Sequence, residues 1–304
     1  MKVVMKNYLE NFFKRYEYPE DSINKLLEAW CILEKNEDFM AIFDLFYKVD
    51  DLEFTDITRN LHKISDDLGV SRHTTGFLYY VALTRYLPEL YKKKGIDESV
   101  MWDSLWDFKY KHDECMELHG VPGFFANGWF YEFLRARLFK LGRLEFHIIT
   151  YNSDPVTING TEIKRGDSVI NIHIPSSGES FASEVRYESY HKAYHFFKDV
   201  FGKDIKLFYC HSWLLFPKNE EILGEKSNIV SFLRDFRNVK SALYDDPRDN
   251  MWRIFGKYGE APIEDLPRDS SLRRAYADYL ASGAHPGHGV GVFLWDDENR
   301  VPLR

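Results

Sequence analysis

The stretch NIHIPSSGES, residues 171–180, ends a β-branched run at Pro175 and continues into small residues. A helical pattern follows at 183–201, with Ser183 as its candidate N-cap. A strand, a small-residue loop and a helix in this order commonly hold a phosphate, because the N–H groups of a helix N-terminus attract anions. The stretch therefore predicts either an anion site or a polar turn between two elements.

The segments around this stretch predict a mixed sheet. Apolar alternation predicts strands at 143–151, 168–174 and 205–215, and Asn159-Gly160 predicts a hairpin between the first two. The helix at 183–201 connects the second and third strands, so these two are parallel if they share a sheet. Ligands of open α/β sheets collect beyond the carboxyl ends of parallel strands.

The preceding part of the chain predicts only helices. Apolar residues with helical spacing recur without a strand pattern, at 5–16, 21–35, 37–49, 55–68, 72–93 and 98–119. One more helix is expected at 126–140, ended by Gly142. We expect an α+β protein: an all-helical domain over 1–125, then a mixed α/β domain over 126–304.

Composition excludes several classes of protein. A net charge of -8 argues against a nucleic-acid binder, whose affinity depends on neutralising phosphates. The three cysteines lie far apart and predict no disulfide framework, which favours a reducing cytoplasm. No apolar run approaches the roughly 18–20 residues that span a bilayer. The segment 64–80 resembles a helix-turn-helix, but its second helix is too apolar to contact DNA.

Two groups of histidines have the spacing of metal ligands. His112, Cys115 and His119 share one helical face, and His191 and His195 are four residues apart. Zinc sites usually take ligands from more than one segment, and no second segment with matching spacing is evident. We therefore expect no metal site.

His173 and His211 lie near the carboxyl ends of their strands. Strand alternation places His173 on one face with Asn171, and His211 on one face with Tyr209. Cys210 points the opposite way from His211, so these neighbours form no nucleophile–base pair. Imidazoles at this sheet edge are suited to general acid–base chemistry, although hydrogen-bonded core histidines would give the same pattern.

Several segments together resemble a family of bacterial acyltransferase-like proteins, with a helical N-terminal domain and a GNAT-like C-terminal domain. The resemblance spans nearly the whole chain and is carried by LGRLEF (141–146), NIHIP (171–175), CHSWLL (210–215), SNIVSFLRDF (227–236) and LPRDSSLRRAYADYL…GHGVGVF (266–293).

The resemblance implies that acyl-CoA enters a gap between the strands at 168–174 and 205–215. It also implies that backbone N–H groups of the loop at 175–182 hold the pyrophosphate, within Ser176, Ser177, Gly178, Glu179 and Ser180. Only Gly178 matches the family's loop pattern, since Pro175 occupies its basic or amide position and Glu179 adds a negative charge. Lys164, Arg165, Arg186 and Lys192 are basic residues that could help.

Many GNAT enzymes place a glutamate base on the fourth strand, which has none here, so His173 would replace it. His211 would position or protonate, and Tyr209 or Tyr244 would be the general acid. The sequence thus predicts an acyltransferase that moves an acyl group from acyl-CoA to an amine or hydroxyl of a small molecule or peptide. The alternative is a non-catalytic module that binds a small ligand or peptide in the same cleft.

Overall fold

The computed structural model describes residues 2–46 and 54–304. The chain divides into two compact units, Met1–Arg137 and Leu138–Arg304. Because residues 47–53 are not described, the predicted helix at 37–49 lies partly outside the described residues. No helix within the described ranges is long and apolar enough to cross a membrane.

The first unit is helical, as predicted. Its central element is α5 (Arg72–Leu83), in which every residue from Thr74 to Leu83 is buried. This burial confirms that the second helix of the helix-turn-helix-like segment belongs to the core. The surrounding helices are α1 (Lys2–Arg15), α2 (Glu20–Leu33), α3 (Glu37–Leu45), α4 (Phe54–Leu68), α6 (Leu87–Lys94), α7 (Glu98–Ser104), α8 (Trp106–His119) and α9 (Phe130–Leu134).

The prediction of one helix over 126–140 is wrong. The chain forms only the short α9 and then enters strand β1 (Leu138–Leu141), after Ala136 adopts a left-handed φ of 48°. The Lys94 ammonium donates to the carbonyls of Arg135 and Ala136 at 2.9 Å, which holds this turn. The compact units consequently divide at 137/138, rather than at the predicted 125/126.

The second unit is built on a mixed sheet with the order β1-β2-β5-β6-β8-β7, with β9 paired to β8. Only β5 and β6 are parallel to each other, as the sequence predicted from their crossover helix. The strands are β2 (Leu144–Thr150), β5 (Ser168–His173), β6 (Leu207–Ser212), β7 (Arg237–Leu243), β8 (Gly287–Asp296) and β9 (Val301–Leu303).

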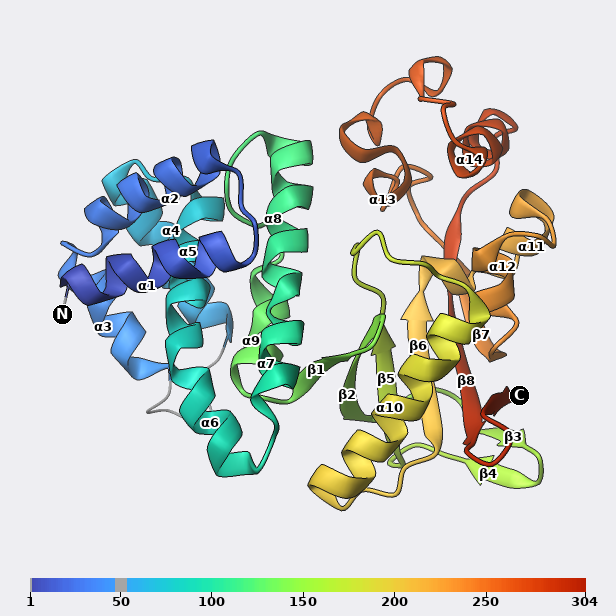
Figure 1. Cartoon of the computed structure of the whole chain (residues 1–304). Helices are drawn as coiled ribbons and strands as arrows, with labels where there is room; N and C mark the ends of the chain where they lie inside the picture. The colour runs from blue at the N-terminus through green and yellow to red at the C-terminus, as the bar shows by residue number, and fades with distance from the viewer. Residues whose placement is uncertain (1, 47–53) are drawn as a thin grey trace. The chain divides into compact units, whose positions relative to one another are not determined.

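One face of this sheet is covered by α10 (Ser183–Phe201), which crosses over the strands (Figure 1). Aromatic side chains fill the space beneath the helix. The rings of Phe208 and Phe293 stack with centroids 4.9 Å apart, and Tyr190 of α10 lies 4.9 Å from Phe293. This face is therefore a packed apolar layer.

The opposite face is covered only in part, by the hairpin of β3 (Val156–Ile158) and β4 (Thr161–Ile163). Asn159 and Gly160 form its turn with φ values of 46° and 77°, as the sequence predicted. Ile158 and Ile163 of the hairpin pack on Val169 and Val292 of the sheet. Polar side chains, among them Asn171, His173 and Tyr209, also lie on this face.

Glycines in β8 let neighbouring chain segments approach its backbone. A Cβ atom at Gly289 would lie 2.1 Å from the Leu215 carbonyl oxygen, a distance no side chain tolerates. The shorter helices of this unit are α11 (Asn219–Leu223), α12 (Asn228–Leu233), α13 (Trp252–Phe255) and α14 (Ser271–Ala281).

Candidate active site

The two parallel strands separate at their carboxyl ends. The ladder between β5 and β6 ends with the pair Asn171–Tyr209, although β5 continues to His173 and β6 to Ser212. Beyond this pair, the backbone of each strand is no longer joined to the other. The sheet therefore opens at the edge where ligands of such sheets usually bind.

Three polar side chains form a cluster beside this opening. The Asn171 amide nitrogen lies 2.9 Å from Nε2 of His147 and 3.0 Å from Nε2 of His173. The two Nε2 atoms are 3.4 Å apart. An amide nitrogen only donates, so both Nε2 atoms act as acceptors and both rings carry their proton on Nδ1. Each imidazole thus has its basic lone pair on the Nε2 atom.

Glu145 of β2 lies directly opposite His173 in the antiparallel register. It shares a face with His147, two residues further along, and is fully buried. Side chains directly opposite one another have Cβ atoms about 4.5–5.5 Å apart. Glu145 therefore places a carboxyl group beside the His173 imidazole.

Sequence reasoning missed both Glu145 and His147. It found that β5 carries no glutamate, but the carboxyl group comes from the neighbouring strand. The alternation in RLEFHIITY places Glu145 and His147 on one face, yet the register between β2 and β5 depends on the intervening hairpin. No short-range pattern specifies that register.

Burial lowers the pKa of two imidazoles on this face, His147 and His211. Desolvation lowers the pKa of His147 to about 4. Desolvation, and then the neighbouring His288, also lower the pKa of His211. Burial raises the pKa of Tyr209, so its phenol stays protonated at neutral pH. This face therefore offers neutral bases and a phenolic proton donor.

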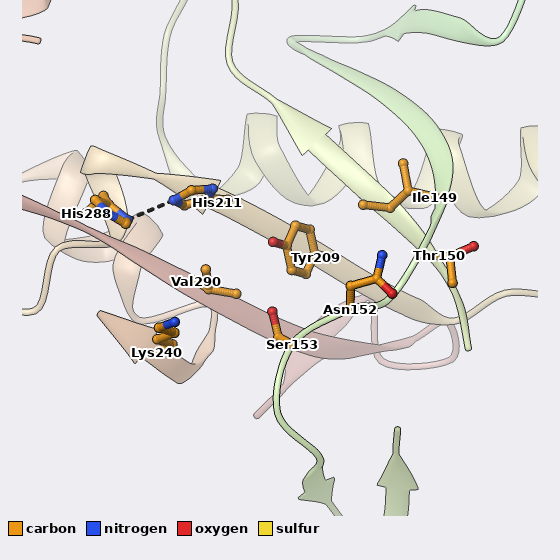
Figure 2. Close-up of a pocket in the computed structure, with 9 residues that line it drawn as sticks. All are labelled: Ile149, Thr150, Asn152, Ser153, Tyr209, His211, Lys240, His288 and Val290. Carbon is orange, nitrogen blue, oxygen red and sulfur yellow. Dashed lines mark hydrogen bonds between the residues drawn. The ribbon is translucent and has the colours of Figure 1, made fainter. Parts of the chain in front are cut away.

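A pocket of about 370 Å³ lies on the same face as Asn171, over β6 and β8. Figure 2 shows His211 and His288 at one end, joined by a hydrogen bond between Nε2 and Nδ1 of 2.7 Å. Tyr209 lies between this pair and the turn after β2. The pocket is lined by Ile149, Thr150, Asn152, Ser153, Tyr209, His211, Lys240, His288 and Val290.

Of the three catalytic residues that the sequence suggested, Tyr209 and His211 line the pocket, whereas His173 lies in the cluster with Asn171 and His147. His173 and Tyr209 belong to the same face, because Asn171 shares a face with His173 and pairs with Tyr209. Tyr244 is further from the strand opening, but its ring lies 5.5 Å from His288. Cys210 is fully buried and burial strongly raises its pKa, which fits its predicted structural role.

The buried Arg143 side chain binds the loop after β5 from the protein interior. Its guanidinium donates to the carbonyls of Pro175 at 2.9 Å and Glu179 at 3.3 Å. Arg143 is 6% exposed and its backbone N–H donates to Ser189 of α10. Two carbonyls of the loop thus point toward the protein interior.

The sequence suggested that Glu179 places an unpaired negative charge in the loop, but the structure pairs this charge. The Glu179 carboxylate forms an ion pair with Lys140 at 3.1 Å. Gly178 has a φ of 71°, a left-handed conformation that favours glycine. Ser177 and Ser180 accept from the backbone N–H groups of Glu179 and Ala182, and Ser176 is exposed.

Arg186 is a structural residue rather than a phosphate ligand. Its side chain is fully buried, and its Nε donates to Asp235 at 2.9 Å. It also donates to the Phe181 carbonyl at 2.6 Å and to Ser231 at 3.1 Å. Every one of these contacts lies inside the protein, which removes Arg186 from the basic residues able to meet a ligand.

The helical spacing of His112, Cys115 and His119 does not create a metal site in the described part of the chain. His112 is buried against Tyr18, and His119 stacks on His73 with ring centroids 4.7 Å apart. Cys115 is buried, and burial raises its pKa to about 12.

Family models match both units. Residues 7–136 match the N-acyltransferase N-terminal domain, and residues 138–293 match the GNAT-like C-terminal domain. Among curated proteins, none matches the sequence.

Solved structures show the same fold over nearly the whole chain. An acyltransferase in complex with decanoyl-CoA and teicoplanin superposes with a TM-score of 0.73 at 23% identity, covering 97% of this chain and 87% of that one. A second acyltransferase complex with decanoyl-CoA has a TM-score of 0.64 at 20% identity, covering 93% of this chain and 98% of that one. A mutant acyltransferase in complex with octanoyl-CoA superposes with the same TM-score, identity and coverage as the first.

Proposed function

This chain belongs to the family of proteins with an N-acyltransferase N-terminal domain and a GNAT-like C-terminal domain, and from that premise we propose that it transfers an acyl group from acyl-CoA to an amine. The observation that carries the proposal is the separation of β5 and β6 beside a set of imidazoles whose Nε2 atoms are acceptors. The thioester would lie in this opening.

His173 is the proposed general base. The amine lone pair attacks the thioester carbonyl carbon, and the amine passes a proton to Nε2 of His173 as the new C–N bond forms. Nε2 gives up the hydrogen bond from Asn171 when it takes this proton. Glu145 is the proposed positioning residue, because a carboxyl group opposite His173 orients the ring and favours the imidazolium. His147 accepts from the same amide as His173 and so fixes the orientation of Asn171.

Breaking the C–S bond releases the CoA thiolate, which then takes a proton. Tyr209 is the proposed donor, because burial keeps its phenol protonated and because Tyr209 of β6 lies opposite Asn171 of β5. His211 and His288 lie in the same pocket and would orient the reacting groups on that side. Hydroxyl, amide and imidazole groups in the lining could bind an amine acceptor, either a small molecule or a peptide.

The loop Ser176–Ser180 is the proposed pyrophosphate site. Arg143 binds two of the loop's carbonyls from the interior and the Glu179 N–H donates to Ser177, so the other backbone N–H groups of the loop would hold the anion. The structural neighbours were solved with decanoyl-CoA and octanoyl-CoA, and we propose that acyl chains of this class are donors for this chain as well.

A non-catalytic binding module is the second candidate, and the loop's departure from the family pattern at Pro175 favours it. Acyl-CoA binding and acyl transfer separate the two. We expect decanoyl-CoA and octanoyl-CoA to raise the melting temperature, and CoA thiol release to require an added amine. Binding without thiol release across a panel of amines would support the binding module. No binding at millimolar acyl-CoA would contradict the acyltransferase and favour a module for another small ligand or a peptide.

Variants of the base test the mechanism. We expect His173→Gln to lower kcat by about 10²- to 10⁴-fold, because glutamine keeps the polar contact but cannot accept the proton. Glu145→Gln should lower kcat less and should lower the pH at which activity begins, because the imidazolium of His173 loses the carboxylate that favours it, whereas acyl-CoA binding should survive in both. The matched control is His62→Gln, at a half-buried histidine of α4. Unchanged turnover in His173→Gln would remove His173 from its role.

A further inference from the structure

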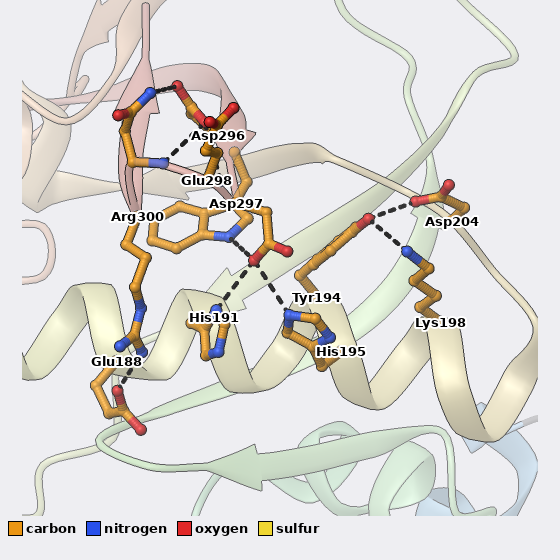
Figure 3. Close-up of polar contacts among 12 residues, drawn as sticks. Glu188, His191, Tyr194, His195, Lys198, Asp204, Asp296, Asp297, Glu298 and Arg300 are labelled. Atoms are coloured by element: carbon orange, nitrogen blue, oxygen red, sulfur yellow. Dashed lines mark hydrogen bonds and ion pairs between the residues drawn. The ribbon is translucent and has the colours of Figure 1, made fainter.

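Two histidines and an aspartate meet on the opposite side of the sheet from the candidate active site. His191 and His195 lie one turn apart on α10, and Asp297 follows the end of β8 (Figure 3). The Asp297 Oδ1 atom is 3.0 Å from Nδ1 of His191 and 3.1 Å from Nε2 of His195. Within the described residues, this is the one group of three or more His, Cys, Asp or Glu side chains close enough to share an ion.

The spacing of these atoms suits a transition metal. A tetrahedral ion with bonds of roughly 2.0–2.1 Å places its ligand atoms roughly 3.3 Å apart. The two distances from Asp297 Oδ1 are close to this value, and all three ligand atoms lie within 4.8 Å of one another. Two imidazole nitrogens and a carboxylate oxygen form a ligand set that zinc commonly takes. Mg²⁺ prefers all-oxygen surroundings and fits this set poorly.

Neighbouring groups orient the carboxylate. The Trp295 indole N–H donates to Oδ1 of Asp297 at 3.2 Å, which is the kind of support that metal-binding carboxylates usually have. Arg300, three residues later, is directed to Glu188 at 2.6 Å and so does not neutralise Asp297.

The site is open to solvent. The side chains of His191, His195 and Asp297 are 30%, 38% and 29% exposed, so an ion can enter and water can complete its coordination. Three protein ligands with one open position characterise exchangeable rather than closed structural zinc sites.

We propose that His191, His195 and Asp297 bind one exchangeable Zn²⁺ ion, which joins α10 to the turn between β8 and β9. This proposal replaces the expectation of no metal, which rested on the absence of a second ligand segment near α10 in sequence. Asp297 supplies that segment from about a hundred residues away. The ion is distinct from the acyl-transfer groups, because α10 packs on the other face of the sheet from His173 and Tyr209.

Titration of the full chain, free of any affinity tag and treated with a chelator, tests the proposal. We expect calorimetry to show one equivalent of Zn²⁺ bound, Co²⁺ to give the visible absorption of a four- or five-coordinate site, and Mg²⁺ to give no signal. Zn²⁺ should also raise the melting temperature of the apo protein, because it binds the folded state.

Variants locate the ion. His195→Gln and Asp297→Asn should each weaken Zn²⁺ binding at least about tenfold, since even the loss of an outer contact has that effect in metal sites. His211→Gln, which breaks the His211–His288 pair, is the matched control and should bind Zn²⁺ as the unmodified chain does.

Circular dichroism of the apo variants establishes that each is folded before titration. The proposal is overturned if the unmodified chain binds no Zn²⁺ at millimolar concentration. It is equally overturned if folded His195→Gln and Asp297→Asn retain full affinity, or if His211→Gln is the variant that loses it.

Discussion

The two faces of the central sheet use the same strands for different purposes. On the α10 face, Phe208 and Phe293 stack in a dry aromatic layer. On the other face, their sequence neighbours Tyr209 and Val292 border a pocket and the β3–β4 hairpin. Alternation along a strand separates these roles at every second residue. Substitutions on the α10 face should therefore change stability without removing a group of the candidate active site.

The largest effect is expected from breaking the buried ion pair on the α10 face. Asp235 accepts from Arg186 and from the phenols of Tyr187 and Tyr190, and its side chain is 3% exposed. Asp235→Asn leaves the Arg186 charge buried without its partner and should lower the free energy of unfolding by about 3–5 kcal/mol. Urea denaturation measures this difference.

The matched control is Glu188→Gln on the same helix, which removes an exposed ion pair with Arg300. That variant should change the free energy of unfolding by about 0–1 kcal/mol. If both variants had equal effects, the contrast between the buried and exposed contacts of α10 would be wrong.

A smaller effect is expected from acid on the polar face. The pKa of His147 is about 4 in the folded protein and near 6.5 when unfolded, so the unfolded chain binds the extra proton first. The contribution of His147 to the free energy of unfolding is present above pH 6.5 and is lost as pH falls toward 4. The free energy of unfolding should fall by up to about 3 kcal/mol over this range. Urea unfolding between pH 7 and pH 4 measures the loss.

His147→Gln should flatten this pH dependence, because glutamine does not titrate. His62→Gln keeps the His147 imidazole on β2 and should leave the acid sensitivity intact. An unchanged slope in His147→Gln would show that His147 is not the group that gains the proton.

The smallest effect is expected from the phenol of Tyr209. Tyr209→Phe should lower kcat about tenfold, less than loss of the base, because a thiol with a pKa near 8.5 leaves as a thiolate with little help from an acid. Steady-state thiol release measures the change. Tyr244→Phe is the comparison: a larger loss in that variant would move the proton donor to Tyr244.

The sequence predicts the two faces better than it predicts their contacts. Alternation in NIHIP and FYCHS correctly places Asn171 with His173 and Tyr209 with His211, because strand geometry is local. The crossover helix correctly makes β5 and β6 parallel. The loop lies where the small residues predict it.

The sequence did not predict contacts between distant segments. Glu145 reaches His173 only through the register of β2 on β5, and Asp297 reaches His195 across more than a hundred residues. The end of the helix before β1 depends on Lys94 and on a left-handed alanine, neither of which is a sequence signal. Such features become visible only in the folded chain.

The two arginines behind the loop after β5 have a consequence for salt dependence. Arg143 and Arg186 bind the carbonyls of Pro175, Glu179 and Phe181 from buried positions. Mobile ions screen charges in solvent far more effectively than buried ones. An anion held by this loop would meet fixed backbone dipoles rather than surface lysines, and its affinity should fall only weakly as ionic strength rises.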